Sequence, residues 1–163
     1  MQNVLPALLG MIREVPACIA PDVQGQTTAK VRFLLNKLVA ELPPDEAYFE
    51  VGVLKGATLI SALLDHKYVT AYANDKWCEY LNENPKATFF ENLKRYKDRL
   101  PEVKVLEGDS FELAKAAPFE KPIGLYFYDG DHSEDAQRKA LTDFAKYLAP
   151  KCIVLVDDWN WEK

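Results

Sequence analysis

The sequence predicts an α/β fold in which a mostly parallel β-sheet is wound on both faces by helices. Short apolar runs alternate along the chain with stretches whose apolar residues recur at helical spacing, which is the pattern of strand–helix–strand units. Each apolar run also ends at an acidic residue, often with a glycine close by. The 163 residues suit one domain with a sizeable core. We therefore expect a single Rossmann-like, doubly wound domain over residues 27–163, preceded by an N-terminal extension over residues 1–26 that contains helix up to about Pro16.

Five strands and the helices between them follow from this alternation. The strands are expected at 48–51, 69–73, 103–106, 123–128 and 153–156. The first helix has Thr27 or Thr28 as a possible cap and stops before Pro43. A later helix starts with Asn84 as N-cap and Pro85 in its first turn. Further helices are expected at 58–64, 111–115 and about 136–148, so that the strands are buried on both faces.

Composition and charge limit the possible partners. The net charge is −5 and no run of basic residues occurs, so a nucleic-acid partner is not expected. No apolar stretch is long enough to span a bilayer, and no membrane association is expected. The three cysteines are widely spaced and odd in number, which favours free thiols in a cytoplasmic location. The expected partner is a small-molecule substrate, and a homo-oligomer is left open.

The loop after the first strand is the first candidate binding element. Gly52 and Gly56 are separated by three residues, and glycine permits a tight turn and the close approach of a ligand. A dinucleotide-binding GxGxxG is absent because position 54 is Leu. The spacing alone leaves two readings open, a ligand-binding loop and a strand–helix turn that needs glycine for packing.

Three motifs together resemble the class I S-adenosylmethionine-dependent methyltransferases. They are Glu50-x-Gly52-x-x-x-Gly56, then Tyr128-Asp129-Gly130-Asp131-His132-Ser133, then Val154-Leu155-Val156-Asp157-Asp158. The latter two are similar to methyltransferase family 24 and to macrocin-type sugar O-methyltransferases. The resemblance implies the strand order 3-2-1-4-5 and an enzyme that uses S-adenosylmethionine.

The resemblance also implies roles for the residues that bind the cofactor. Glu50, Gly52 and Gly56 would line its methionine part, Asp75 would accept from the ribose hydroxyls, and Asp109 and Ser110 would lie beside the adenine. Two of these residues have simpler interpretations. Ser110 is a possible N-cap of the following short helix, and Asp75 is a possible solvated loop residue.

Three aspartates form a candidate metal site. Asp129, Asp157 and Asp158 follow strands that should be neighbours, and carboxylates brought together repel unless a cation lies between them. Oxygen ligands favour Mg²⁺ or a similar hard cation, and related sugar and catechol O-methyltransferases bind such a metal at matching positions. The alternative is a solvated strand end without metal.

The expected reaction is metal-assisted O-methylation of a hydroxylated small molecule such as a sugar. Asp131 is the first candidate for the catalytic base and His132 the second. Asp131 and Glu134 also have the spacing of a helix-capping pair, so Asp131 has a purely structural alternative.

One departure from the family pattern bears on function. The chain reaches Lys163 soon after the fifth strand, whereas class I methyltransferases usually continue with a helix and two further strands. This departure favours the alternative of a non-catalytic or cofactor-binding Rossmann-like domain. A nicotinamide-dependent oxidoreductase is the less favoured alternative, because the GxGxxG motif is missing.

Overall fold

A computed structural model describes residues 10, 17–78, 83–116 and 118–159. Five strands form one sheet in the order β3-β2-β1-β4-β5, and all four pairings are parallel. The strands are β1 (Ala47–Val51), β2 (Thr70–Asp75), β3 (Val103–Glu107), β4 (Ile123–Tyr128) and β5 (Leu148–Val156). The predicted fold class and strand order are confirmed. One strand differs from the prediction in length. Strand β5 begins five residues before the predicted start at residue 153, because Leu148 already pairs with Ile123, ahead of a register shift.

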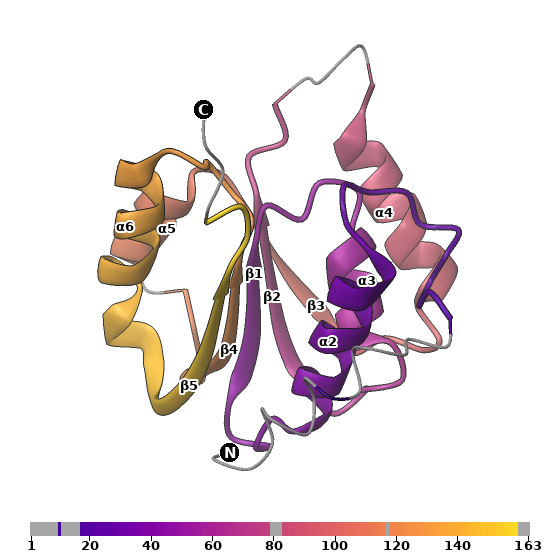
Figure 1. The fold of residues 1–163 in the computed structure, drawn as a ribbon, viewed down its shortest axis with the longest axis horizontal. Helices are drawn as coiled ribbons and strands as arrows, with labels where there is room; N and C mark the ends of the chain where they lie inside the picture. The colour runs from indigo at the N-terminus through magenta and orange to yellow at the C-terminus, as the bar shows by residue number, and fades with distance from the viewer. Residues whose placement is uncertain (1–9, 11–16, 79–82, 117, 160–163) are drawn as a thin grey trace.

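Helices cover both faces of the sheet, giving three layers (Figure 1). Helices α2 (Ala29–Ala40), α3 (Ala57–Leu63) and α4 (Pro85–Tyr96) lie on one side. Helices α5 (Ser110–Ala116) and α6 (Glu134–Thr142), with the 3-10 turn η2 (Ala145–Tyr147), lie on the other. Two of the predicted helix starts are confirmed: the Thr28 hydroxyl accepts from the Val31 amide, and Asn84 accepts from the Ala87 amide.

The middle of the sheet is the best-packed part of the molecule. Every residue of β1 and of β4 is buried. Alternate side chains of β1 enter opposite layers, with Tyr48 packed toward α2 and α3 and Phe49 packed against Phe144 beyond α6. Because both faces of the central strands are packed in this way, the loops that follow β1 and β4 start from a rigid base.

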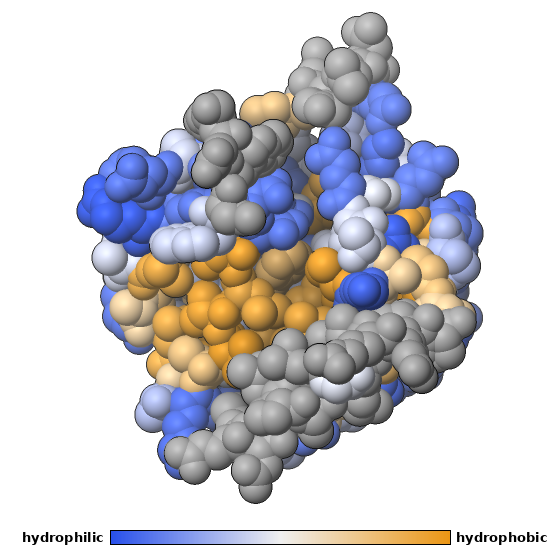
Figure 2. Space-filling model, viewed as in Figure 1, coloured by the Kyte–Doolittle hydropathy of each residue, from blue (hydrophilic) through white to orange (hydrophobic). Residues whose placement is uncertain are grey.

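The outer strand β5 is less covered. Residues 152–156 are only partly buried, and Figure 2 shows apolar residues gathered over this edge of the sheet. Within the described ranges, no helix is long and apolar enough to cross a membrane. All three cysteines are free thiols, as predicted.

The segment that precedes α2 packs on the domain. Ala20 and Val23 are buried in the core cluster on the α2–α3 side. The helix predicted up to Pro16 lies outside the described residues, and the division of the chain at residue 26 stays a prediction.

Candidate active site

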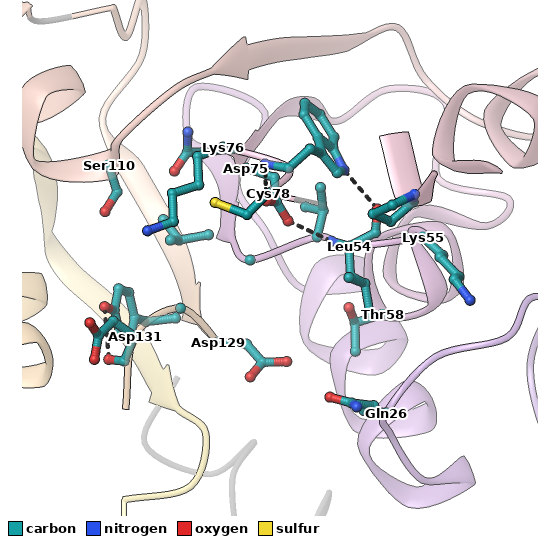
Figure 3. Close-up of a pocket in the computed structure, with 18 of the residues that line it drawn as sticks. Gln26, Leu54, Lys55, Thr58, Asp75, Lys76, Cys78, Ser110, Asp129 and Asp131 are labelled. Atoms are coloured by element: carbon teal, nitrogen blue, oxygen red, sulfur yellow. Dashed lines mark hydrogen bonds between the residues drawn. The ribbon is translucent and has the colours of Figure 1, made fainter. Parts of the chain in front are cut away.

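A cavity of about 480 Å³ opens at the carboxyl ends of the strands (Figure 3). The loops after β1, β2, β3 and β4 form its walls, together with residues 25–27 before α2. Seven of the predicted site residues line it: Gly52, Asp75, Asp109, Ser110, Asp129, Asp131 and His132. The other four, Glu50, Gly56, Asp157 and Asp158, do not. The carboxyl ends of the strands therefore form a cavity, as the sequence predicts, but not all of the expected residues line it.

The glycine loop after β1 has the backbone conformation that its composition suggests. Gly52 and Gly56 have φ of 85° and 87°, a region that side chains with a Cβ disfavour. A Cβ on Gly52 would lie 1.8 Å from the carbonyl oxygen of Asp129, so β1 and β4 can approach only through glycine here. Gly56 instead ends the loop, directly before α3, and a Cβ there would crowd Phe89 and Ile60.

Asp75 fixes two loops with one carboxylate. Its Oδ2 accepts from the Leu54 amide at 2.8 Å and its Oδ1 accepts from the Trp77 amide at 2.7 Å. Both residues have positive φ, and the Trp77 indole N–H donates to the Leu54 carbonyl oxygen at 2.8 Å. Such conformations are costly for non-glycine residues and persist where the surroundings impose them. Asp75 is thus an organiser of the pocket wall and not a solvated loop residue, so that alternative is wrong.

Glu50 lies behind the pocket surface and is fully buried. The hydroxyls of Tyr48 and Thr58 both donate to its carboxylate. Burial raises the pKa of Glu50 to about 8, against the opposing effect of these hydrogen bonds. Since Thr58 itself lines the cavity, Glu50 is connected to the site through that side chain, and direct contact with a cofactor stays a prediction.

Asp109 and Ser110 lie side by side after β3. The Asp109 carboxylate accepts from the amides of Phe111 and Glu112 at 2.9 and 3.2 Å. Asp109 therefore caps α5, which begins at Ser110. The alternative that Ser110 is the helix cap is wrong, because the capping geometry belongs to the residue before it.

Asp129 and His132 face each other after β4. The pKa of Asp129 is raised to about 7 by burial and, secondarily, by the carboxylates of Asp157, Asp158 and Asp75. The His132 Nε2 lies 3.9 Å from one Asp129 oxygen and 3.9 Å from one Asp158 oxygen. The Nε2 atom thus lies between two carboxylates at the edge of the cavity.

The three aspartates predicted as metal ligands are not arranged around one point. No group of three or more His, Cys, Asp or Glu side chains that could hold a metal ion occurs among the described residues. The Asp157 and Asp158 backbone carbonyls instead lie 3.3 and 3.4 Å from the Gln137 side-chain amide, which holds this turn. The side chains as placed do not fit the predicted Mg²⁺ centre.

Asp131 has a local structural role as well as a place in the cavity wall. Its carboxylate accepts from the Ser133 amide at 2.8 Å. The N-cap of α6 is Ser133, whose hydroxyl accepts from the Ala136 amide. The capping pair predicted from Asp131 and Glu134 is therefore wrong, since the N-cap lies two residues after Asp131, at Ser133.

The chain can be placed in a family by sequence. Residues 49–159 match the model of a methyltransferase domain. The chain belongs to this family of methyltransferase domains. No protein of curated function matches the chain in sequence. The matched range contains every predicted site residue, and the chain is a methyltransferase domain, as predicted.

Solved structures share the fold of this methyltransferase domain. A precorrin-6y C5,15-methyltransferase from Geobacter metallireducens is 15% identical with a TM-score of 0.61, over 87% of this chain and 70% of that one. An SAH-bound methyltransferase from Podospora anserina is 17% identical with a TM-score of 0.62, over 96% and 62%. An O-methyltransferase from Bacillus cereus in complex with SAH is 16% identical with a TM-score of 0.59, over 94% and 65%. The chain thus spans about two thirds of the length of these structures.

Several pocket residues of the methyltransferase domain were not predicted from the sequence. Gln26 and Thr27 come from the segment before α2. No spacing rule singled them out, because they lie in a loop without periodicity.

Proposed function

We propose that this domain transfers a methyl group from S-adenosylmethionine to a hydroxyl of a small molecule such as a sugar. The observation that carries the proposal is the paired wall of the cavity, with Asp75 on the β2 side and Asp129 with His132 on the β4 side. Each Asp75 oxygen accepts one backbone amide and keeps a further acceptor site, which suits the two donors of a ribose diol. The SAH-bound solved structures of the same fold support the choice of cofactor.

The residues of this chain supply orientation and a base. Bound S-adenosylmethionine supplies an electrophilic methyl group on a sulfonium sulfur. Asp129, half-buried in the wall, carries a negative charge that attracts the sulfonium when ionised. His132, whose Nε2 lies near two carboxylates in the same wall, would take up the proton of the acceptor hydroxyl when the methyl group is transferred. Asp131, in the same wall, is the second candidate for this base.

A methyl-transfer assay with labelled S-adenosylmethionine and a panel of sugars, polyols and catechols tests the proposal. We expect His132→Asn to lower kcat by about 100-fold or more, with SAH (S-adenosylhomocysteine, the demethylated product) bound as before. A comparable loss in Asp131→Asn, with His132→Asn active, would transfer the role of base to Asp131. Cofactor binding without methylation of any acceptor would instead favour a non-catalytic cofactor-binding domain.

Metal assistance is the part of the predicted function with the least geometric support. The described carboxylates are not gathered around one point, and no step above passes through a cation. The same assay with EDTA separates the two cases. Activity that survives chelation agrees with the side-chain arrangement, whereas activity lost with EDTA and restored by Mg²⁺ would re-establish the predicted metal site.

A further inference from the structure

The two edges of the sheet differ in how they are protected from pairing with another strand. Strand β3 lies at one edge and β5 at the other. Strand β3 contains Lys104 and Glu107, and Lys104 forms an ion pair with Glu120. Strand β5 has no charged residue between Cys152 and Val156. Because charged side chains on an edge strand discourage pairing with another chain, β3 has this protection and β5 lacks it.

The apolar side chains of β5 are incompletely covered on both faces of the sheet. Ile153 and Leu155 pack against the core cluster on the α2–α3 side, and Val154 and Val156 pack against the cluster on the α6 side. All four are only partly buried, and Figure 2 shows apolar residues gathered over this edge. A further strand beside β5 would remove apolar area from water on both faces, which is favourable.

The backbone of β5 presents hydrogen-bonding groups along its outer side. The Asp157 amide donates to the Tyr128 carbonyl oxygen, and Val156 is the partner of Tyr128 in the parallel register. The N–H and C=O groups of successive strand residues point to alternate sides. Those of Leu155 therefore point toward β4, and those of Val154 and Val156 point away from it. Among the described residues, no strand lies on that outer side.

The two ends of this apolar stretch carry opposite charges. Lys151 precedes it and Asp157 follows it, each the same number of residues from Val154. In an antiparallel pair with the two Val154 residues opposite each other, Lys151 of each copy lies opposite Asp157 of the other. Ile153 then lies opposite Leu155. Opposite charges and apolar side chains are favourable cross-strand pairs, so this segment is complementary to a second copy of itself.

We propose that β5 pairs antiparallel with β5 of a second copy of this chain, about a two-fold axis at Val154. The two Val154 residues then exchange N–H···O=C hydrogen bonds, and the two five-stranded sheets become one continuous sheet. The apolar rows on both faces continue from one copy into the other. Lys151 and Asp157 close each end of the paired strands. This pairing does not depend on the proposed cofactor or reaction.

Sedimentation equilibrium of the purified chain tests the pairing. We expect the mass of two chains at micromolar concentration. Val154→Pro removes an outward N–H and keeps the bonds between β4 and β5, because an edge strand tolerates proline where the N–H faces outward. We expect this variant to weaken dimerisation by about 100-fold or more, since the two central hydrogen bonds are lost and the proline rings meet at the axis.

The matched control lies on the other edge of the sheet. The Gly108 amide donates to the Asp75 carbonyl oxygen at 3.0 Å, and Asp75 is the partner of Glu107 in the parallel register. By the same alternation, the Val105 N–H points away from β2. Val105→Pro therefore makes the same change on the charged edge strand, and it should leave the dimer affinity unchanged.

Charge reversal tests the register. Lys151→Asp and Asp157→Lys should each weaken dimerisation by about 10-fold, because two attractive pairs become two repulsive ones. The double variant again has opposite charges across the paired strands. Its affinity should return to within about 3-fold of that of the unmodified chain.

The combined results decide the matter. A dimer that Val154→Pro dissociates and that the double charge variant retains supports the inference. A monomer at every concentration overturns it, as does a dimer that Val154→Pro leaves intact, because the outer side of β5 would then be open or covered by another partner. A double variant that does not recover overturns the register. Urea unfolding checks each variant, and if Val154→Pro is not folded, the charge variants decide.

Discussion

On the β1–β2 side of the cavity the side chains are locked into the backbone, whereas on the β4–β5 side they face each other across longer gaps. Asp75 holds two loop amides at 2.7 and 2.8 Å. Across the cavity, the His132 Nε2 stands 3.9 Å from two carboxylates. The first side is built before any ligand arrives, in keeping with a site for an invariant cofactor. The second side retains the freedom to adjust around an acceptor.

The glycine at the junction of the two sides should have the largest effect when changed. Gly52→Ala places a Cβ 1.8 Å from the Asp129 carbonyl oxygen, at a φ of 85°. We expect the free energy of unfolding in urea to fall by more than about 4 kcal/mol, because backbone must move apart. The control is Gly108→Ala, whose φ is 130° but whose Cβ meets nothing within 4 Å, and it should cost about 1–3 kcal/mol. Equal losses in the two variants would show that the contact between β1 and β4 is not limiting.

The buried carboxyl behind the locked side should give the fold a pH dependence. The pKa of Glu50 is raised from 4.5 to about 8, chiefly by burial. Charging it therefore costs folding energy, so its contribution to stability is full below about pH 4.5 and is lost as the pH rises to about 8. We expect Glu50→Gln to remove this slope, on the order of 3–5 kcal/mol over that range.

Urea unfolding at a series of pH values measures the effect. Exposed Glu91→Gln serves as the control and should keep the slope of the unmodified protein. An unchanged slope in Glu50→Gln would mean that this carboxyl is charged and solvated in the folded protein.

A smaller effect should appear on the open side. The pKa of Asp129 is raised to about 7 by burial and neighbouring carboxylates, so the group gains its charge between about pH 6 and 8. Affinity for the cationic S-adenosylmethionine should rise across this range by up to about 10-fold. Affinity for SAH, which has a neutral sulfur, should rise less. The two calorimetric profiles should coincide in Asp129→Asn, and their coincidence in the unmodified protein would contradict this role.

The sheet was predictable because two features of the sequence mark each strand. Each is a short apolar run, and each ends at a polar residue that the topology then brings to one rim, as Asp75 and Asp129 illustrate. The course of residues 17–27, which precede α2, was not predictable in the same way. The buried Arg32 guanidinium of α2 donates to the carbonyl oxygens of Ile19, Ala20 and Val23. Arg32 lies on the same helical face as Leu35 and Val39, but a charged residue in that stripe did not reveal which carbonyl oxygens it would bind.

The acidic site residues show the limit most clearly. The sequence places Asp129, Asp157 and Asp158 at neighbouring strand ends. The pKa of Asp129 is raised by burial and, to a smaller extent, by the nearby carboxylates of Asp157 and Asp158. The pattern of residues along the chain does not indicate which way each of these side chains points. Asp158, with a φ of 50° in the turn after β5, shows a backbone conformation that no pattern indicated. Whether carboxylates converge on a cation depends on those rotations.

Calorimetric titration of the purified chain with S-adenosylmethionine tests the central claim most directly. We predict saturable binding at one site, which is weakened by at least about 10-fold in Asp75→Ala because the variant loses the acceptor for both loop amides and for the ribose. The exposed Asp98→Ala control should bind as the unmodified chain does. Absence of binding to S-adenosylmethionine and to SAH, in a chain that is folded by urea unfolding, would contradict the account.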